Sequence, residues 1–276
     1  MKKTLRAYVH NRNLFIGSIM VLSVVFVAVF ADLIAPYSYT AAHLQDKMLA
    51  PCAQYPFGTD EFGRDMLSRV IYGAQPALRV AVIAMLIEVG IGVTLGLLAG
   101  YYGGAADYVI TFIGDLTWCV PPIVLTMAVI TMIGKGLDNV IIATALVSWA
   151  QYTRVVRAKT QALRAQAFVE TAIAFNEKDA SIMLRYILPN IVPSIIVLAS
   201  LSIPQTIMST TALSFLGMGA QAPSPDWGLA LSNGFTYITT APWLAVFPGV
   251  ALVYTVFAFN LLGEGLRDWL DPRMKS

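Results

Sequence analysis

The sequence predicts an all-α integral membrane protein with about six transmembrane helices. Of its 276 residues, 57% are hydrophobic and only 12% are charged, which is about half the charged share of an average soluble domain. Apolar runs of about 18 residues or more, the length that crosses a bilayer as a helix, recur along the chain. An intrinsically disordered chain is excluded, because such chains are poor in apolar residues.

Six apolar segments are expected to span the bilayer. In chain order they are 14–34, 80–100, 108–133, 137–152, 187–215 and 243–262. The first follows a basic lead, but its apolar core is longer than the roughly 7–15 residues of a signal peptide, so a retained helix is expected. The fourth is short, and the last two contain no charged residue.

The distribution of basic residues predicts that both termini lie in the cytoplasm. Of the 18 Lys and Arg residues, four precede the first span, six lie between the fourth and fifth spans, and three follow the sixth. With six spans these three segments share one side of the membrane, and Lys and Arg concentrate on the cytoplasmic side. We treat residues 1–276 as one transmembrane domain, with an outer loop at 35–76 and a cytoplasmic segment at 153–186.

The cytoplasmic segment contains a short helix with an apolar face. Phe168, Ala172 and Phe175 recur at the spacing i, i+4, i+7. The helix is expected to end at Asn176, which tolerates the left-handed conformation of a helix C-terminus. A second short helix should follow and stop near Pro189. The segment is either a surface helix resting on the membrane or a docking helix that fits a groove in a partner.

Two acidic residues, Glu88 and Asp115, fall inside predicted spans, where a charge is costly and indicates a specific role. Each either lines a translocation path or forms a structural pair, for which Arg79 and Arg64 are candidate partners; Glu88 could also pair across an interface with another subunit. Structural pairing is the favoured reading. Pro121 breaks the helical hydrogen bonding of its span together with the proline that follows it.

Three glycines in the second span, Gly92, Gly96 and Gly100, repeat at intervals of four residues. This small-residue pattern lets another helix approach closely, so it predicts packing rather than substrate binding.

No catalytic residue, metal site or cofactor site is predicted in this chain. The G-x-x-x-x-G-K-[ST] loop that binds nucleotide phosphates is absent, so the chain should not hydrolyse ATP by itself. Its two cysteines, Cys52 and Cys119, and its isolated histidines, His10 and His43, do not form a metal-binding pattern. No basic stripe indicates a nucleic-acid partner.

Several separated motifs resemble one transporter family. The run Phe168-Val169-Glu170-Thr171-Ala172, then Asn176 and later Leu188-Pro189, resembles the signature loop of ABC-importer permeases, whose pattern is Glu-Ala-Ala, three residues, Gly, and a later Leu-Pro. Thr171 and Asn176 depart from that pattern. Segments 57–65, 215–219 and 263–272 resemble the dipeptide/oligopeptide/nickel permeases, and specifically the second permease of the pair.

The resemblance implies a binding-protein-dependent permease fold in a bacterial inner membrane. Its expected partners are membrane lipid, a sister permease, an extracytoplasmic solute-binding protein, and two ATPase subunits that carry ATP and Mg²⁺. The cytoplasmic helix would then couple ATP hydrolysis to transport, through Phe168, Glu170, Thr171, Ala172, Phe175 and Asn176. The implied substrates are dipeptides, longer peptides, nickel, metal–chelator complexes or glutathione. A secondary transporter without an ATPase and a non-transporting membrane scaffold or receptor are the alternatives.

Overall fold

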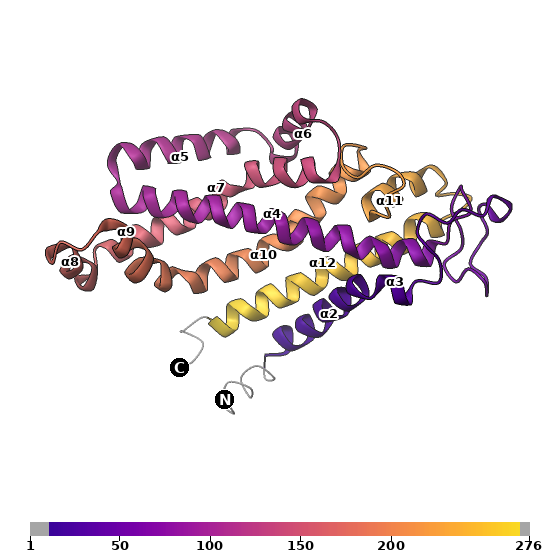
Figure 1. The fold of residues 1–276 in the computed structure, drawn as a ribbon, viewed down its shortest axis with the longest axis horizontal. Helices are drawn as coiled ribbons and strands as arrows, with labels where there is room; N and C mark the ends of the chain where they lie inside the picture. Colours follow the sequence, from indigo (N-terminus) through magenta and orange to yellow (C-terminus); the bar gives the residue numbers. More distant parts are fainter. Residues whose placement is uncertain (1–10, 271–276) are drawn as a thin grey trace.

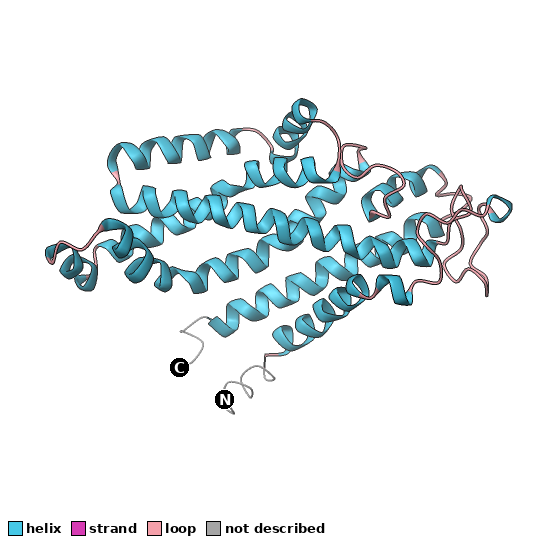
Figure 2. Ribbon diagram, in the orientation of Figure 1, coloured by secondary structure: helices cyan, strands magenta, loops and turns pink. Residues whose placement is uncertain are grey.

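The computed structural model describes residues 11–270, and every regular element within them is a helix (Figure 2). The helices form one elongated bundle (Figure 1). In chain order they are α2 Arg12–Val29, α3 Ala31–Ile34, the 3₁₀ turn Leu44–Asp46, α4 Met66–Tyr102, α5 Gly104–Cys119, α6 Pro122–Ile133, α7 Leu137–Arg164, α8 Ala167–Ala174, α9 Asp179–Ser181, the π-helical turn Ile182–Ile187, α10 Leu188–Phe215, α11 Trp227–Thr236 and α12 Trp243–Leu270. The predicted all-α class is confirmed.

Four of the described helices are long and apolar enough to cross a membrane, and a fifth span results if α5 and α6 count as one broken span. The four are α2, α4, the continuous helix Asp179–Phe215, and α12. The remaining predicted span, 137–152, forms the first half of α7. This helix is 28 residues long, but it is too polar to count among the helices that could cross a membrane by length and composition. The reason is that α7 continues into a polar, basic half and is buried among other helices rather than facing lipid along its length.

Helices α4 and α7 lie against each other along the three glycines predicted to pack. A side-chain carbon built on Gly92 would lie 2.4 Å from the Cβ atom of Tyr152, and one on Gly96 would lie 2.7 Å from that of Val156. The hydroxyl of Thr153 also donates a hydrogen bond to the Gly92 carbonyl, at 3.1 Å. Backbones this close exclude any larger residue, so the packing role of these glycines is confirmed.

The predicted third span is broken at its proline pair. Helices α5 and α6 meet at an angle of 96°, with Pro121 as the N-cap and Pro122 as the first residue of α6. Proline has no backbone N–H, so it cannot continue α5 but is well suited to begin a new helix. After the bend, Trp118 near the end of α5 faces a cavity that residues of α7 and α10 also line.

Helix α10 corrects the expectation that a short helix stops near Pro189. The helix from Asp179 continues through a π-helical turn into α10 and ends only at Phe215. Pro189 directly follows the π-helical turn Ile182–Ile187, and a local π-helical adjustment of this kind lets a proline be tolerated inside a transmembrane helix. Pro193 and Pro204 also lie within α10.

The two long connections are shorter than predicted. Helix α4 begins at Met66 because the carboxylate of Asp65 accepts the Ser68 backbone N–H at 2.8 Å and caps the helix. The loop between α3 and α4 therefore covers 35–65 rather than 35–76. At the other connection, α7 extends to Arg164 and includes the first part of 153–186.

Loop 35–65 is fixed to the bundle by an arginine that binds backbone carbonyls. The guanidinium of Arg69 donates to the carbonyls of Tyr39 at 3.1 Å and of Ser224 at 3.0 Å. Within the loop, Arg64 and Asp60 form a buried ion pair at 2.6 Å. The loop and α11 lie at one end of the bundle, and α8 lies at the opposite end (Figure 1).

The first described helix and the last lie together. The side chain of Asn11, which caps α2, donates a hydrogen bond to the carbonyl of Gly265 in α12, at 3.0 Å. The start of α2 and the end of α12 are on the α8 side of the bundle (Figure 1). The basic tails on which the orientation prediction partly depends, residues 1–10 and 271–276, lie outside the described residues.

Candidate functional site

One face of α8 is anchored to the bundle. Val169 is fully buried and Ala172 is 6% exposed. Both belong to an apolar cluster that also contains Leu97 of α4, Val156 of α7 and Ile187 of the π-helical turn. These contacts attach α8 to α4, to α7 and to the π-helical turn that leads into α10. The position of α8 is therefore determined by the chain itself.

The opposite face of α8 is open and aromatic. Phe168 is 43% exposed, and Phe175 at the C-cap is 83% exposed. Glu170 and Thr171 are exposed as well. Phe168, Thr171 and Phe175 follow one another at intervals of three and four residues and share a helix face. An exposed pair of phenylalanine rings is the kind of surface that a protein partner covers.

The prediction that Ala172 is available to a partner together with Phe168 and Phe175 is wrong, because Ala172 is buried. Ala172 points into the chain's own core together with Val169, three residues before it. The helix has apolar residues on both sides, so periodicity alone did not identify which side is buried. Of the predicted coupling residues, Phe168, Glu170, Thr171 and Phe175 face outward and Ala172 does not.

The turn after α8 has the predicted left-handed residue. Asn176 has a φ of 55°. Its N–H bonds the carbonyl of Ile173 at 2.9 Å, and the N–H of Glu177 bonds that of Ala172 at 3.1 Å. These two bonds form a Schellman motif, which satisfies the last carbonyls of a helix. The prediction for Asn176 as the residue that ends the helix is confirmed.

Two side-chain hydrogen bonds hold the segment that follows this turn. The carboxylate of Glu177 accepts the Ser181 hydroxyl at 2.7 Å, and this bond is the largest cause that holds the pKa of Glu177 below its usual value. The Tyr101 hydroxyl of α4 donates to Asp179 at 2.7 Å. The path from α8 to α10 is therefore a defined structure rather than a loose linker.

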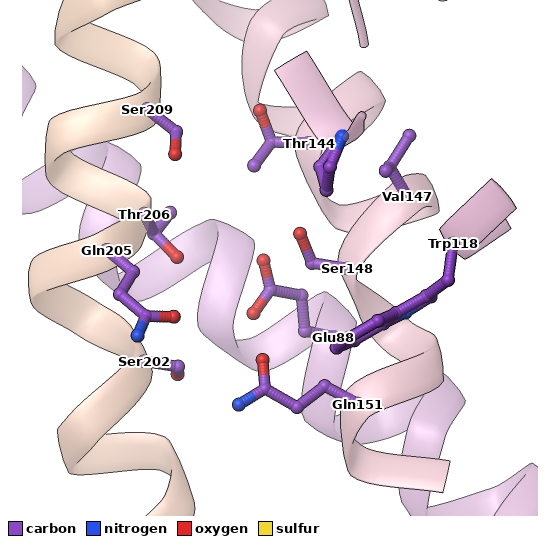
Figure 3. A pocket seen from close by; sticks show the side chains of 11 residues that line it. Glu88, Trp118, Thr144, Val147, Ser148, Gln151, Ser202, Gln205, Thr206 and Ser209 are labelled. Carbon is purple, nitrogen blue, oxygen red and sulfur yellow. The ribbon is translucent and has the colours of Figure 1, made fainter. Parts of the chain in front are cut away.

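A polar cavity of about 200 Å³ lies among α4, α7, α10 and the bend between α5 and α6. Figure 3 shows Glu88 of α4 pointing into it between α7 and α10. The cavity is lined by Glu88, Trp118, Pro122, Thr144, Val147, Ser148, Gln151, Ser202, Gln205, Thr206 and Ser209. Nine of these side chains can form hydrogen bonds, a dense polar group for an apolar bundle.

Glu88 forms no ion pair with Arg79 or Arg64, the two partners predicted within this chain. Glu88 is 1% exposed, and its Oε1 atom has no hydrogen-bond partner among the described residues. Arg79 pairs with Asp138 at 2.7 Å, and Arg64 pairs with Asp60. Both arginines named as candidate partners are thus bound elsewhere, and Glu88 remains a buried acid that faces a cavity.

Asp115 forms a structural pair, although with a different arginine from those predicted. Arg154 of α7 donates to its Oδ1 at 2.7 Å, with both side chains about half exposed. The same guanidinium lies over the ring of Trp118, 4.4 Å from its centre. Arg154 lies just beyond the predicted end of the fourth span, so sequence position did not single it out.

The cavity residues other than Glu88 were missed from the sequence, although a signal for them is present. Along α10, Ser202, Gln205, Thr206 and Ser209 recur at the spacing i, i+3, i+4, i+7. On α7, Thr144, Val147, Ser148 and Gln151 have the same spacing. A polar stripe of helical period inside an apolar span marks a face that turns away from lipid. No group of three or more His, Cys, Asp and Glu residues could hold a metal ion in residues 11–270.

Comparisons with known proteins identify the family. Residues 92–276 match the family described as "Binding-protein-dependent transport system inner membrane component", and residues 1–51 match "N-terminal TM domain of oligopeptide transport permease C". The chain is 41% identical over 266 residues to the dipeptide transport system permease protein DppC of Alkalihalophilus pseudofirmus, covering 96% of this chain and 88% of that protein.

Two glutathione transport system permeases are similar at the same level. The GsiD protein of Escherichia coli O6:K15:H31 is 45% identical, with 94% of this chain and 86% of that protein covered. The GsiD protein of Pectobacterium atrosepticum is 40% identical, with 94% and 87% covered. The chain therefore belongs to the binding-protein-dependent transport system inner membrane components, the family of permease subunits of ABC importers.

Proposed function

We propose that this permease carries small peptides across a bacterial inner membrane and takes its energy from separate ATPase subunits that dock on α8. The complete importer would contain a sister permease, two ATPase subunits with ATP and Mg²⁺, and an extracytoplasmic solute-binding protein. Both termini and α8 would lie in the cytoplasm, and loop 35–65 would face the solute-binding protein.

The observation that carries the proposal is the two-sided nature of α8. Its inner face belongs to the same apolar cluster as α4, α7 and the start of α10, while its outer face exposes Phe168 and Phe175. A partner that binds the outer face would act on the spans through the inner one. A helix that merely rests on lipid has no need for a rigid connection of this kind.

Peptides are the proposed substrates because the similar permeases belong to a dipeptide system and to glutathione systems. Nickel and metal–chelator complexes were also implied by the sequence resemblance. The described part of the chain contains no cluster of side chains that could hold a metal ion. The structure therefore gives no support for transport of a bare metal ion.

The test is to replace Phe175 by alanine in the assembled importer. Phe175 is exposed, so the substitution should leave the permease folded while it removes an aromatic anchor worth about 2 kcal/mol or more of the interface. We expect the ATPase subunits to co-purify in much lower yield and ATP-dependent uptake of alanyl-alanine to fall in parallel. Phe168→Ala should act in the same direction, with a smaller effect because that ring is partly covered by the chain itself.

Phe235→Ala is the matched control. Phe235 is 65% exposed and lies in α11, at the end of the bundle opposite α8 (Figure 1). This variant should keep its ATPase subunits. Normal assembly and uptake in Phe175→Ala would contradict docking at α8. Uptake that survives ATP depletion but stops when the ion gradient is dissipated would indicate a secondary transporter instead.

A further inference from the structure

The cavity around Glu88 has the features of a binding site for a cation. Glu88 is the one charged side chain among its eleven lining residues, and none of them is Lys, Arg or His. The other polar groups are two carboxamides, five hydroxyls and the indole N–H of Trp118. The lining therefore offers one negative charge surrounded by neutral hydrogen-bonding oxygens.

Two of these buried side chains lack partners. Oε1 of Glu88 and the hydroxyl oxygen of Thr144 make no hydrogen bond within the described residues. Buried polar atoms in native proteins are nearly always paired, so each exception needs an explanation. The arginines of the neighbouring helices do not supply one, because each pairs with another acid: Arg79 with Asp138, Arg154 with Asp115, and Arg157 with Asp107.

The cavity is accessible from one side. Glu88 and Thr144 are buried at its inner wall, whereas Gln205 and Ser209 of α10 are exposed. Trp118, at the end of α5, is half exposed. Figure 3 shows the carboxylate of Glu88 directed toward the space between Gln205 and Ser148. The cavity therefore opens past α10, with the Glu88 carboxylate at its inner wall.

The donor set favours an organic ammonium group over a divalent metal ion. A divalent ion held by oxygen is usually bound by several carboxylates or carbonyls, and this lining offers a single carboxylate. A primary ammonium group carries one positive charge and donates three hydrogen bonds. Glu88 would balance the charge, and the side-chain oxygens of Gln151, Gln205 and Thr144 lie around it as further acceptors.

We propose that this cavity is a subsite for the free amino-terminal ammonium group of the transported peptide, with Glu88 as its counter-ion. The proposal rests on the proposed function as a peptide importer. Dipeptides and glutathione share a free primary amine, whereas their carboxylates would be repelled by this lining. A cavity of about 200 Å³ is smaller than the roughly 300–1,000 Å³ of sites that enclose a whole ligand, so it holds one end of the peptide during passage.

The first experiment compares two substrates in the reconstituted importer, with the same solute-binding protein throughout. Alanyl-alanine has a free amine, and its Nα-acetyl derivative does not. Glu88→Gln keeps the shape of the side chain and removes its charge. We expect uptake of alanyl-alanine to fall about tenfold or more in Glu88→Gln, while uptake of the acetylated peptide stays at its wild-type level. Because the same solute-binding protein delivers each peptide to the wild type and to the variant, its selectivity does not change the ratio of variant uptake to wild-type uptake.

Asp138→Asn is the matched control, since it removes an acid that is exposed and paired with an exposed arginine. It should transport both peptides as the wild type does. Equal loss of both substrates in Glu88→Gln, or loss of the assembled complex, would overturn the subsite and indicate a structural or intersubunit role. Unchanged uptake of both would overturn it as well.

A second experiment tests the subsite without transport. The hydrophobic reagent dicyclohexylcarbodiimide reacts with carboxyl groups in apolar surroundings, and mass spectrometry of membranes that carry the complex would measure its adduct on Glu88. Alanyl-alanine amide, which has a free amine and no carboxylate, should lower the amount of adduct severalfold. Its Nα-acetyl derivative should not.

The second experiment separates the two proposals. A wild-type importer that takes up neither peptide would contradict the proposed function, and protection of Glu88 by the free amine alone would still support the subsite. Equal protection by both amides, or by neither, would overturn the subsite even in an importer that transports peptides.

Discussion

Single residues decide how closely the two central helices approach. Glycines of α4 face α7 at distances that leave no room for a methyl group, and the pattern was readable in the sequence because small residues repeated every four positions. The same was true of Asn176, since few residues adopt a positive φ at low cost. The pairing of Asp115 with Arg154 was not readable, because pairing depends on which helices become neighbours.

Two neighbouring glycines give a matched pair of variants. Gly92→Ala should lower the thermal stability of the purified permease, because the new methyl group would lie 2.4 Å from Tyr152 and 2.7 Å from the Trp149 carbonyl. Gly90→Ala should be neutral or slightly stabilising, because no atom lies within 4 Å of its Cβ position and alanine favours a helix by about 1 kcal/mol over glycine. Heating in detergent followed by gel filtration measures both. Equal stability of the two variants would contradict the close α4–α7 contact.

At the scale of elements, α8 differs most from what its sequence suggested. Its apolar spacing predicted a short helix correctly, but it did not reveal that Val169 and Ala172 are buried by α4, α7 and the π-helical turn. Those contacts are made by residues far away in the sequence. The continuation of the helix past Pro189 was missed because the sequence did not reveal the π-helical turn Ile182–Ile187, which accommodates the proline inside a continuous helix.

The burial of Ala172 changes what its substitution reports. Ala172→Arg should destabilise the permease itself, because an arginine would have to occupy an apolar cluster without a partner charge. The purified variant should lose its native gel-filtration peak at lower temperature than the wild type. Thr171→Arg, one residue away on the exposed face, should keep that temperature. A stable Ala172→Arg protein would show that α8 can leave the core.

At the scale of the whole molecule, loop 35–65 and α8 lie at opposite ends of the bundle (Figure 1). Composition and hydropathy were enough to predict the helical membrane class, because every backbone group inside a bilayer must be paired within the chain. They predicted only the first half of α7, as the short fourth span 137–152, because α7 continues into a polar, basic half.

The arrangement of the ends predicts a topology that reporter fusions can measure. A fusion near Asp46, in the loop, and a fusion near Lys178, after α8, should report opposite sides of the membrane. From the basic residues around α8 we predict that this end lies in the cytoplasm. Reporters on the same side would mean that the long axis of the bundle does not cross the bilayer.

Helix α7 connects the two candidate sites mechanically. Gln151 borders the cavity, and Arg164 ends the helix only two residues before α8, so one uninterrupted rod of about 20 Å separates them. Gly92, Gly96 and Gly100 hold α7 against α4, and the apolar cluster around Val169 holds α8 against α7. If a partner displaces α8, we expect the displacement to move Ser148 and Gln151 at the cavity wall. Variants that loosen the contact of Gly92, Gly96 and Gly100 with α7 should therefore retain ATP hydrolysis by the assembled importer and lose transport.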